Sequence, residues 1–180
     1  MNSQKYTTEG KSKMKIYTYP DKVLRITADP VENIDEGIQT LIDNMLQTMY
    51  DAPSGIGLAA PQVGETKRII VYDLMHAKNK PKDSHVLINP EITAGEGEER
   101  YEEACLSVID FSAEITRKAK VEVRGFDRHG KPVLIEADKM LAICLQHEID
   151  HLNGTLIVDY VSPLKRSIYK KKLQKKRKRH

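Results

Sequence analysis

Two histidines and a glutamate lie close together in the segment Gln146-His147-Glu148-Ile-Asp-His151. In an α-helix, residues four apart share one face about one turn from each other, so both imidazoles can reach the same metal ion. A glutamate directly after the first histidine serves as the general base in such H-E-x-x-H sites. A solvated helix face that carries two histidines is the simpler alternative, but Glu148 and the apolar residues around it favour a metalloenzyme centre.

A third ligand is needed, because a catalytic zinc-type site takes three protein ligands and keeps one position open. The chain has two cysteines, Cys105 and Cys144. Cys144 precedes His151 by seven residues, which is about 10 Å along a helix axis and too far for short side chains to share an ion. We therefore interpret Cys144 as a buried pocket or core thiol. Cys105 is the favoured third ligand, with a small core residue in a strand as its alternative reading.

These residues need a helix to position them, and the sequence around them predicts one. Apolar residues recur near every 3.6 positions from Asp138 to Gly154, with Asp138 as a candidate N-cap and Gly154 as a candidate stop. The same periodicity predicts an amphipathic helix from Val31 to Tyr50. Ser162 and Pro163 predict the start of a last helix.

Several strands are predicted from apolar runs or alternating patterns. They cover residues 68–72, 85–90, 118–124, 132–136 and 155–160. Residues 93–101 are rich in Gly and Glu and predict a loop or a poorly packed hairpin. Strands that flank one central helix, without alternating strand and helix, predict an α+β fold. We expect mostly antiparallel strands packed around a central metal-binding helix, with a C-terminal helix.

Length and composition are typical of one globular domain. Of the 180 residues, 39% are hydrophobic and 31% are charged, and no apolar run approaches the roughly 18 residues of a membrane span. The polar N-terminus predicts no secretory signal, and two cysteines make no disulfide framework. We expect a cytoplasmic monomer without membrane contact. Its predicted parts are a flexible extension at 1–13, a catalytic domain at 14–165, and a basic helix or tail at 166–180.

Positive charge is concentrated at the C-terminal end. Residues 165–180 carry ten Lys and Arg and no acidic residue, so subtracting them from the net charge of +3 leaves −7 for the first 164 residues. Such a run is usually a solvated tail. A contact with phosphate backbone, ribosomal RNA above all, is an equally supported interpretation.

A glycine-rich segment, Gly55-Ile-Gly-Leu-Ala-Ala-Pro-Gln62, is a second candidate site. It lacks the Gly-Lys-Ser/Thr end of a phosphate-binding loop. In a strand, its glycines allow another backbone to lie close, which suits an extended peptide paired along the strand. Gln62 could then donate a side-chain N–H to an oxygen that develops negative charge.

Together these segments resemble the bacterial-type peptide deformylase family. Its three motifs are G-φ-G-φ-A-A-x-Q, E-G-C-φ-S and Q-H-E-φ-D-H, where φ is apolar. In this sequence they correspond, in the same order, to Gly55–Gln62, Glu103–Ser107 and Gln146–His151. The first and third match completely, and the likeness extends from about Met14 to Lys165.

The resemblance implies a metal-dependent hydrolase. Cys105, His147 and His151 would hold one divalent metal ion, Fe²⁺ in the cell, with Zn²⁺ or Ni²⁺ able to occupy the site. Glu148 would take a proton from the attacking water and pass it to the departing amine. The substrate would be the formyl-methionine end of a nascent polypeptide, and formate would be released.

The resemblance also implies roles around the reacting group. Gln62 and the backbone N–H of Leu106 would stabilise the oxyanion formed on the formyl carbonyl. Glu103 would pair with Arg117 behind the site as structural support.

Substrate binding is implied for two further sets of residues. Gly55, Ile56 and Gly57 would pair with the peptide backbone. Ile143 and Cys144 would line the pocket for the methionine side chain.

The second motif departs from the family pattern. Ala104 stands where the family has glycine, and Ile109 replaces a proline. An alanine is harmless at negative φ but strained at positive φ. The departures concern the pocket rim and substrate affinity, because all three expected ligands remain.

Two other functions fit parts of the sequence. A general zinc metallopeptidase would need only the helix motif, but Cys105 and the Gln62 segment favour the deformylase. A non-catalytic ribosome- or RNA-binding module would be built around the basic end and would bind with a steep salt dependence.

Overall fold

The central element of the structure is helix α2 (Lys139–Leu152), which carries the predicted metal-binding motif. The computed structural model describes residues 13–53, 55–76 and 82–177. Asp138 takes the N-cap position of α2, as predicted, although its side chain accepts no capping hydrogen bond from the described backbone. Beyond the helix, Gly154 has a φ of 71°, and a Cβ there would lie 2.7 Å from the carbonyl oxygen of Arg25. Only glycine fits this turn, so the predicted stop is confirmed.

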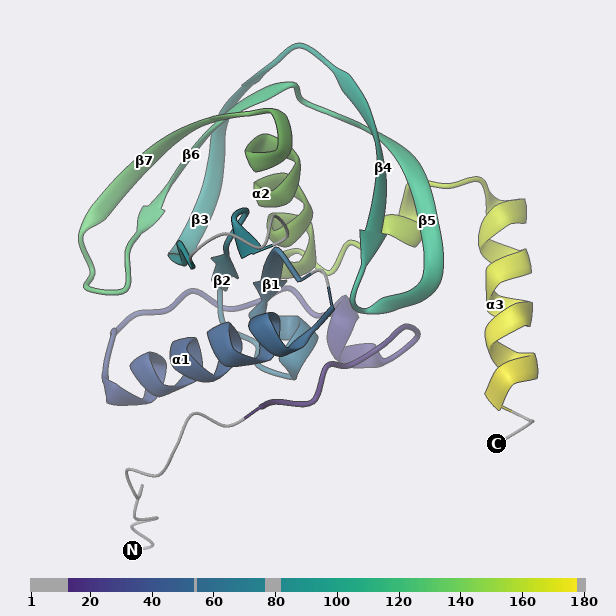
Figure 1. Cartoon of the computed structure of the whole chain (residues 1–180), viewed down its shortest axis with the longest axis horizontal. Helices are drawn as coiled ribbons and strands as arrows, with labels where there is room; N and C mark the ends of the chain where they lie inside the picture. The colour runs from purple at the N-terminus through teal and green to yellow at the C-terminus, as the bar shows by residue number, and fades with distance from the viewer. Residues whose placement is uncertain (1–12, 54, 77–81, 178–180) are drawn as a thin grey trace, which may run out of the picture.

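A five-stranded antiparallel sheet curves around α2 (Figure 1). In spatial order its strands are β1 (Gly57–Ala59), β2 (Ile69–Tyr72), β3 (His85–Glu96), β6 (Lys120–Phe126) and β7 (Pro132–Asp138). The predicted strands at 68–72, 85–90, 118–124 and 132–136 are all present, and the last two pair as a hairpin. β1 is at the edge of this sheet, and β2 is its only strand partner among the described residues.

Helix α1 (Glu36–Asp51) packs on the opposite face of the sheet from α2. Along β2, Ile69 and Val71 join the cluster under α1, whereas Ile70 joins the cluster under α2. Burial on both faces explains why this strand is a continuous apolar run rather than an alternating one. The helix begins later than predicted. Asp35 is its N-cap, and the Asp35 carboxylate accepts a hydrogen bond from the backbone N–H of Ile38.

A separate two-stranded hairpin lies on the side of α2 away from β6 and β7 (Figure 1). It consists of β4 (Glu99–Cys105) and β5 (Val108–Arg117). Neither prediction for residues 93–101 is correct: they are not a loop, because they complete β3 and begin β4, and they are not a hairpin, because β3 pairs with β6 and β4 with β5. Their side chains are exposed on both faces of the strands, so no hydrophobic alternation marks them, and backbone pairing with β6 and β5 determines their conformation.

The predicted strand at residues 155–160 is also wrong. The segment contains a short 3₁₀ helix, η4 (Ile157–Asp159), in which the Asp159 carboxylate accepts a hydrogen bond from the backbone N–H of Leu156 at 2.9 Å. Two more 3₁₀ turns are η1 (Lys22–Arg25) and η2 (Ala60–Val63). A buried apolar run of this length does not distinguish strand from turn, and here a local side-chain hydrogen bond favours the turn.

The last helix, α3 (Pro163–Arg177), lies at the edge of the molecule beside β5 (Figure 1). Tyr169 is buried against Tyr19 and Phe111, and its hydroxyl donates to the carbonyl oxygen of Ile109 at 2.8 Å. Tyr169 is the buried anchor of a helix whose other described side chains are mostly exposed, and Arg166 and Lys176 add polar contacts to Asp159 and Asp110.

Helices and antiparallel sheets around α2 confirm the predicted α+β fold. The flexible extension predicted for residues 1–13 lies outside the described residues, apart from Lys13, as does the end of the basic tail at 178–180. Among the described helices, none has the length and apolar character that crossing a membrane requires.

Candidate metal centre and active site

Three possible metal ligands converge where the β4–β5 hairpin meets α2. Cys105, His147 and His151 each offer one ligand atom, and these atoms all lie within 4.8 Å of one another. The Cys105 sulfur is 3.2 Å from Nε2 of His151. One thiol and two imidazoles form a donor set that suits divalent metals such as Zn²⁺ and Fe²⁺. The structure thus brings together the three residues that the sequence proposed, and their chemistry fits one ion.

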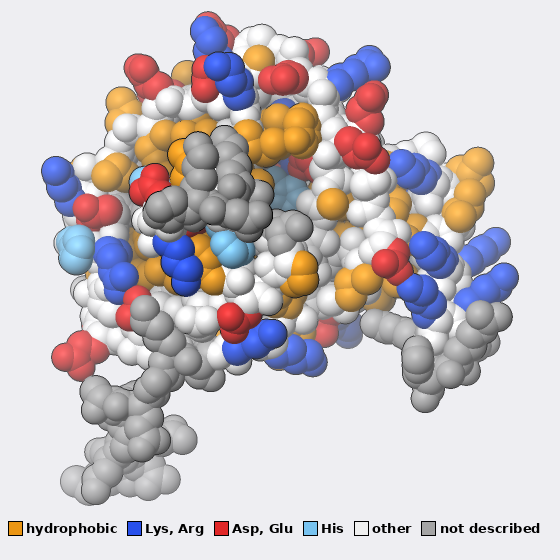
Figure 2. All heavy atoms as spheres, viewed as in Figure 1, with side chains coloured by type: hydrophobic (Ala, Val, Ile, Leu, Met, Phe, Trp, Pro, Cys, Tyr) orange, Lys and Arg blue, Asp and Glu red, His pale blue; other side chains and the backbone are white. Residues whose placement is uncertain are grey.

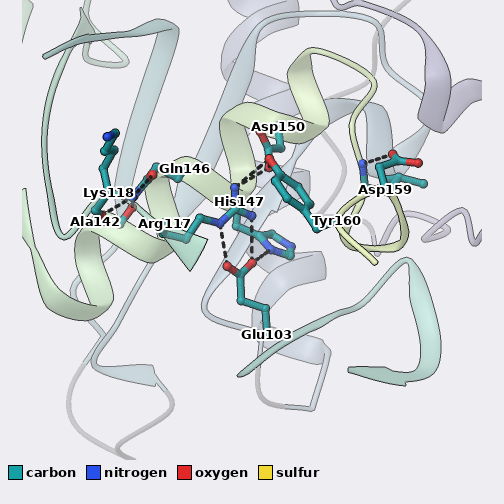
Figure 3. A network of polar contacts seen from close by, with 10 residues as sticks. Glu103, Arg117, Lys118, Ala142, Gln146, His147, Asp150, Asp159 and Tyr160 are labelled. Carbon is teal, nitrogen blue, oxygen red and sulfur yellow. Dashed lines mark hydrogen bonds and ion pairs between the residues drawn. The ribbon is translucent and has the colours of Figure 1, made fainter. Parts of the chain in front are cut away.

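The orientation of His147 is fixed from behind. Its Nδ1 lies 2.8 Å from a carboxylate oxygen of Glu103, and Arg117 holds both oxygens of that carboxylate at 2.7 and 3.0 Å (Figure 3). Burial opposes ionisation of Glu103, but hydrogen bonds from His147 and Arg117 hold the pKa of this carboxyl below its ordinary value. Because a carboxylate can only accept, Nδ1 of His147 donates, and its Nε2 is left to bind a metal.

The carboxylate of Glu148 is buried beside these residues. Only 4% of Glu148 is exposed, and its Oε2 has no hydrogen-bond partner among the described residues. Burial raises the pKa of Glu148 to about 7. A Cβ on Gly57 would lie 2.4 Å from Oε1 of Glu148, so the glycine provides the space that this carboxylate occupies. The unpartnered oxygen can exchange a proton with a group placed next to it.

A cavity of about 300 Å³ opens over Cys105, His147 and Glu148. It is lined by all the residues proposed for the substrate and the oxyanion, namely Gly55, Ile56, Gly57, Gln62, Leu106, Ile143 and Cys144. Pro53, Tyr101 and Met140 line it too, and sequence reasoning missed them because nothing in their types or spacing indicates a site. Cys144 is 4% exposed and lies outside the ligand group.

Gln62 has a fixed orientation at the cavity. Its side-chain oxygen accepts a hydrogen bond from the backbone N–H of Ala59 at 2.8 Å. The amide nitrogen therefore points the other way, 3.2 Å from the hydroxyl of Ser107 and 3.8 Å from the sulfur of Cys105. A buried N–H donor held next to the ligands can stabilise negative charge on a substrate oxygen.

The two departures in the second motif leave the site intact. Among the described non-glycine residues, positive φ values occur at Asn89, Asp110 and Lys139, and Ala104 is not one of them. The alanine therefore carries no left-handed strain. Ile109 is 52% exposed near the start of β5, next to α3.

Comparison with known proteins identifies a family. The model of the polypeptide deformylase family matches residues 13–167. A peptide deformylase of Thermodesulfovibrio yellowstonii is 51% identical over 164 residues, which cover 91% of this chain and 98% of the relative. One of Azotobacter vinelandii is 51% identical over 92% of this chain and 96% of its own length. A solved peptide deformylase structure from Legionella pneumophila superposes with a TM-score of 0.85 at 48% identity, covering 93% of this chain and 96% of that one.

The ligand set predicts different effects for the two cysteines. Cys105→Ala should lower the affinity for Zn²⁺ by more than about 100-fold, because losing a ligand costs more than the 10–100-fold typical of outer-shell changes. Cys144→Ala should leave the affinity unchanged. Competition with a chromophoric chelator measures both, and equal losses in the two variants would contradict the assignment.

Proposed function

The chain belongs to the polypeptide deformylase family, hydrolases that remove the N-formyl group from nascent polypeptides, and we propose how its own residues carry out this reaction. Cys105, His147 and His151 hold one divalent metal ion, Fe²⁺ in the cell, in a site that Zn²⁺ or Ni²⁺ can also occupy. The observation that carries the proposal is the convergence of one sulfur and two ring nitrogens within 4.8 Å. The ion supplies Lewis acidity, which polarises a carbonyl group and lowers the pKa of water.

Glu148 moves the proton. Glu148 lines the cavity together with His147, and one oxygen of its buried carboxylate has no hydrogen-bond partner among the described residues, so we propose that the attacking water donates to it. After the water attacks the formyl carbon, the protonated Glu148 returns the proton to the nitrogen of the departing amine. The water thus adds to the formyl group, the C–N bond breaks, and formate and a free amino terminus result.

Two N–H groups stabilise the oxyanion that forms in this attack. The Gln62 amide nitrogen is buried and faces Cys105, because Ala59 holds the amide oxygen on the other side. The backbone N–H of Leu106, the residue after Cys105, is the second donor. Donors fixed before the reaction need no reorganisation when the charge develops.

The substrate binds along the edge of the five-stranded sheet. β1 is the edge strand, and Gly55, Ile56 and Gly57 line the cavity, which supports backbone pairing with an extended peptide. The methionine side chain enters the apolar part of the cavity next to Ile143 and Cys144. Because the chain belongs to the polypeptide deformylase family, we favour this reaction over that of a general metallopeptidase.

The basic end of the chain is proposed to contact the ribosome. Lys and Arg side chains gather over α3 in Figure 2, and they are exposed along most of the described helix. A basic helix of this kind is attracted to the phosphates of ribosomal RNA. Such a contact would bring the cavity to formylated chains as they are made, in the cytoplasm. We propose a monomer, since every group assigned to the reaction comes from one chain.

The proton-transfer role predicts the effect of removing the carboxylate. Glu148→Ala should reduce kcat by at least about 100-fold, since general acid–base catalysis contributes 10²–10⁴-fold. Metal content should stay at that of the parent. The measurement is formate release from formyl-Met-Ala-Ser by anaerobically prepared Fe²⁺ protein. Equal release by the parent and the variant would refute the role of Glu148.

The space at Gly57 predicts a second loss. Gly57→Ala places a methyl group 2.4 Å from Oε1 of Glu148, so the carboxylate must move. We expect kcat to fall at least tenfold, which corresponds to a rise of about 1.4 kcal/mol or more in the activation free energy. Gly37→Ala, at an exposed position of α1, is the control and should keep full activity. Normal formate release by Gly57→Ala would show that the position of Glu148 is not constrained as described.

If α3 contacts the ribosome, reversing its charge should weaken ribosome binding without reducing the catalytic activity. Replacing three exposed lysines of α3 by glutamate should weaken sedimentation with ribosomes and reduce its salt dependence. These are Lys170, Lys171 and Lys175. Formate release from free peptide should be unchanged.

The control replaces three exposed lysines elsewhere, so that the net charge changes by the same amount. These are Lys15, Lys22 and Lys131. If both triple variants lose ribosome binding equally, net charge rather than α3 is responsible.

A further inference from the structure

The ion pair behind His147 is part of a larger network. Besides holding Glu103, the guanidinium of Arg117 donates through one nitrogen to the carboxylate of Asp150 at 2.6 Å and to the hydroxyl of Tyr160 at 3.1 Å (Figure 3). The Tyr160 hydroxyl in turn donates to the same oxygen of Asp150 at 2.6 Å. Neither Asp150 nor Tyr160 has a role in the reaction described above.

The network places two carboxylates around one buried cation. The side chains of Arg117 and Glu103 are 4% and 3% exposed, and that of Asp150 is 22% exposed. Burial and the neighbouring Asp150 carboxylate raise the pKa of Tyr160 to about 12, so its hydroxyl is neutral and can donate. Two carboxylates and one hydroxyl therefore satisfy a guanidinium that would be costly to bury alone.

The network connects the two elements that carry the metal ligands. Arg117 ends β5, Glu103 lies on β4 two residues before Cys105, and Asp150 lies on α2 between the two histidines. Each carboxylate thus ties Arg117 to a different element. Without the Asp150 contact, the guanidinium of Arg117 would keep Glu103 of the hairpin and the hydroxyl of Tyr160, but it would lose its hydrogen bond to α2.

A second connection runs parallel to the first. The side chain of Gln146 on α2 accepts from the backbone N–H of Lys118 at 3.0 Å and donates to its carbonyl oxygen at 2.9 Å. Lys118 follows Arg117 directly. The hairpin is therefore held to the helix at two neighbouring points, one neutral and one charged.

We propose that Asp150 and Tyr160 are positioning residues of the metal centre, which act through Arg117 and Glu103 on the ring of His147 and on the distance between hairpin and helix. The inference rests on the ligand set proposed above. Asp150 fixes the guanidinium from the helix side, and Tyr160 orients Asp150. Because Glu103 is held by the same guanidinium, a shift of Arg117 changes the hydrogen bond that sets the His147 ring.

Tyr160→Phe isolates the contribution of the hydroxyl. The ring of Tyr160 lies over the guanidinium, 4.7 Å from the ring centre to Cζ of Arg117, and phenylalanine retains this contact. Tyr160 is 44% exposed, so the variant should fold. Tyr50→Phe is the matched control, since the Tyr50 hydroxyl also donates to a carboxylate, that of Asp73, at 2.7 Å, outside the network.

The test uses Co²⁺ as a spectroscopic probe in the full-length protein. Tyr160→Phe should weaken Co²⁺ binding about fivefold, the equivalent of one hydrogen bond. Asp150→Asn should weaken it about 10–100-fold, as expected for an outer-shell change. Both variants should shift the visible absorption bands of the bound ion, whereas Tyr50→Phe should change neither affinity nor bands.

The outcomes separate this inference from the proposed ligand set. Parent-like spectra and affinities in Tyr160→Phe and Asp150→Asn would overturn the positioning role while leaving the ligands in place. Failure of the parent itself to bind Co²⁺ through sulfur and nitrogen would overturn the ligand set. A similar loss in Tyr50→Phe would attribute the effect to general stability and would also overturn the positioning role.

Discussion

The buried pair of Glu103 and Arg117 determines how the β4–β5 hairpin meets α2. Charges removed from water are tolerated only when they are paired with good geometry, so this bidentate contact accepts little variation in distance or angle. Glu103 and Cys105 are two residues apart on β4, and both side chains reach the histidines of α2: Glu103 lies 2.8 Å from Nδ1 of His147, and the Cys105 sulfur lies 3.2 Å from Nε2 of His151. Fixing the carboxylate against His147 therefore also brings the sulfur to the histidines. The same contact between hairpin and helix thus fixes both the ion pair and the three ligands. The cavity beside them is left open for a substrate.

Periodicity predicted the elements whose burial is one-sided or complete. The helix of residues 139–152, strand β2 and the β6–β7 hairpin all carry clear apolar patterns, and their types were correct. The errors lie where side chains gave no such signal. Residues 93–101 are strands with exposed side chains on both faces, and backbone pairing with neighbours distant in sequence determines them. In residues 155–160 the apolar run Leu156 to Val158 is buried as in a strand, but the segment turns because the Asp159 carboxylate accepts from the backbone N–H of Leu156.

More of the candidate site than of the fold could be predicted from the sequence, because few residue types can serve as metal ligands or as a general base. Two histidines four apart with an intervening glutamate, together with a cysteine elsewhere, leave few arrangements, and the structure places these side chains together. The orientation of Gln62 could not be read from sequence, since it depends on which backbone N–H its oxygen accepts. Tyr160 gave no signal either, whereas Asp150 stood inside the helix motif, and its spacing from His147 already placed it one turn away on α2.

The most direct test of the account is the ligand environment of the bound metal. X-ray absorption spectroscopy of the Zn²⁺-loaded protein reports the number and type of ligand atoms. The account predicts one sulfur at about 2.3 Å and two imidazole nitrogens at about 2.0–2.1 Å, contributed by Cys105, His147 and His151. A first shell without sulfur would remove Cys105 from the site. A shell with two sulfurs would bring in Cys144 and contradict the separation of the two cysteines on which the assignment of ligands and substrate pocket depends.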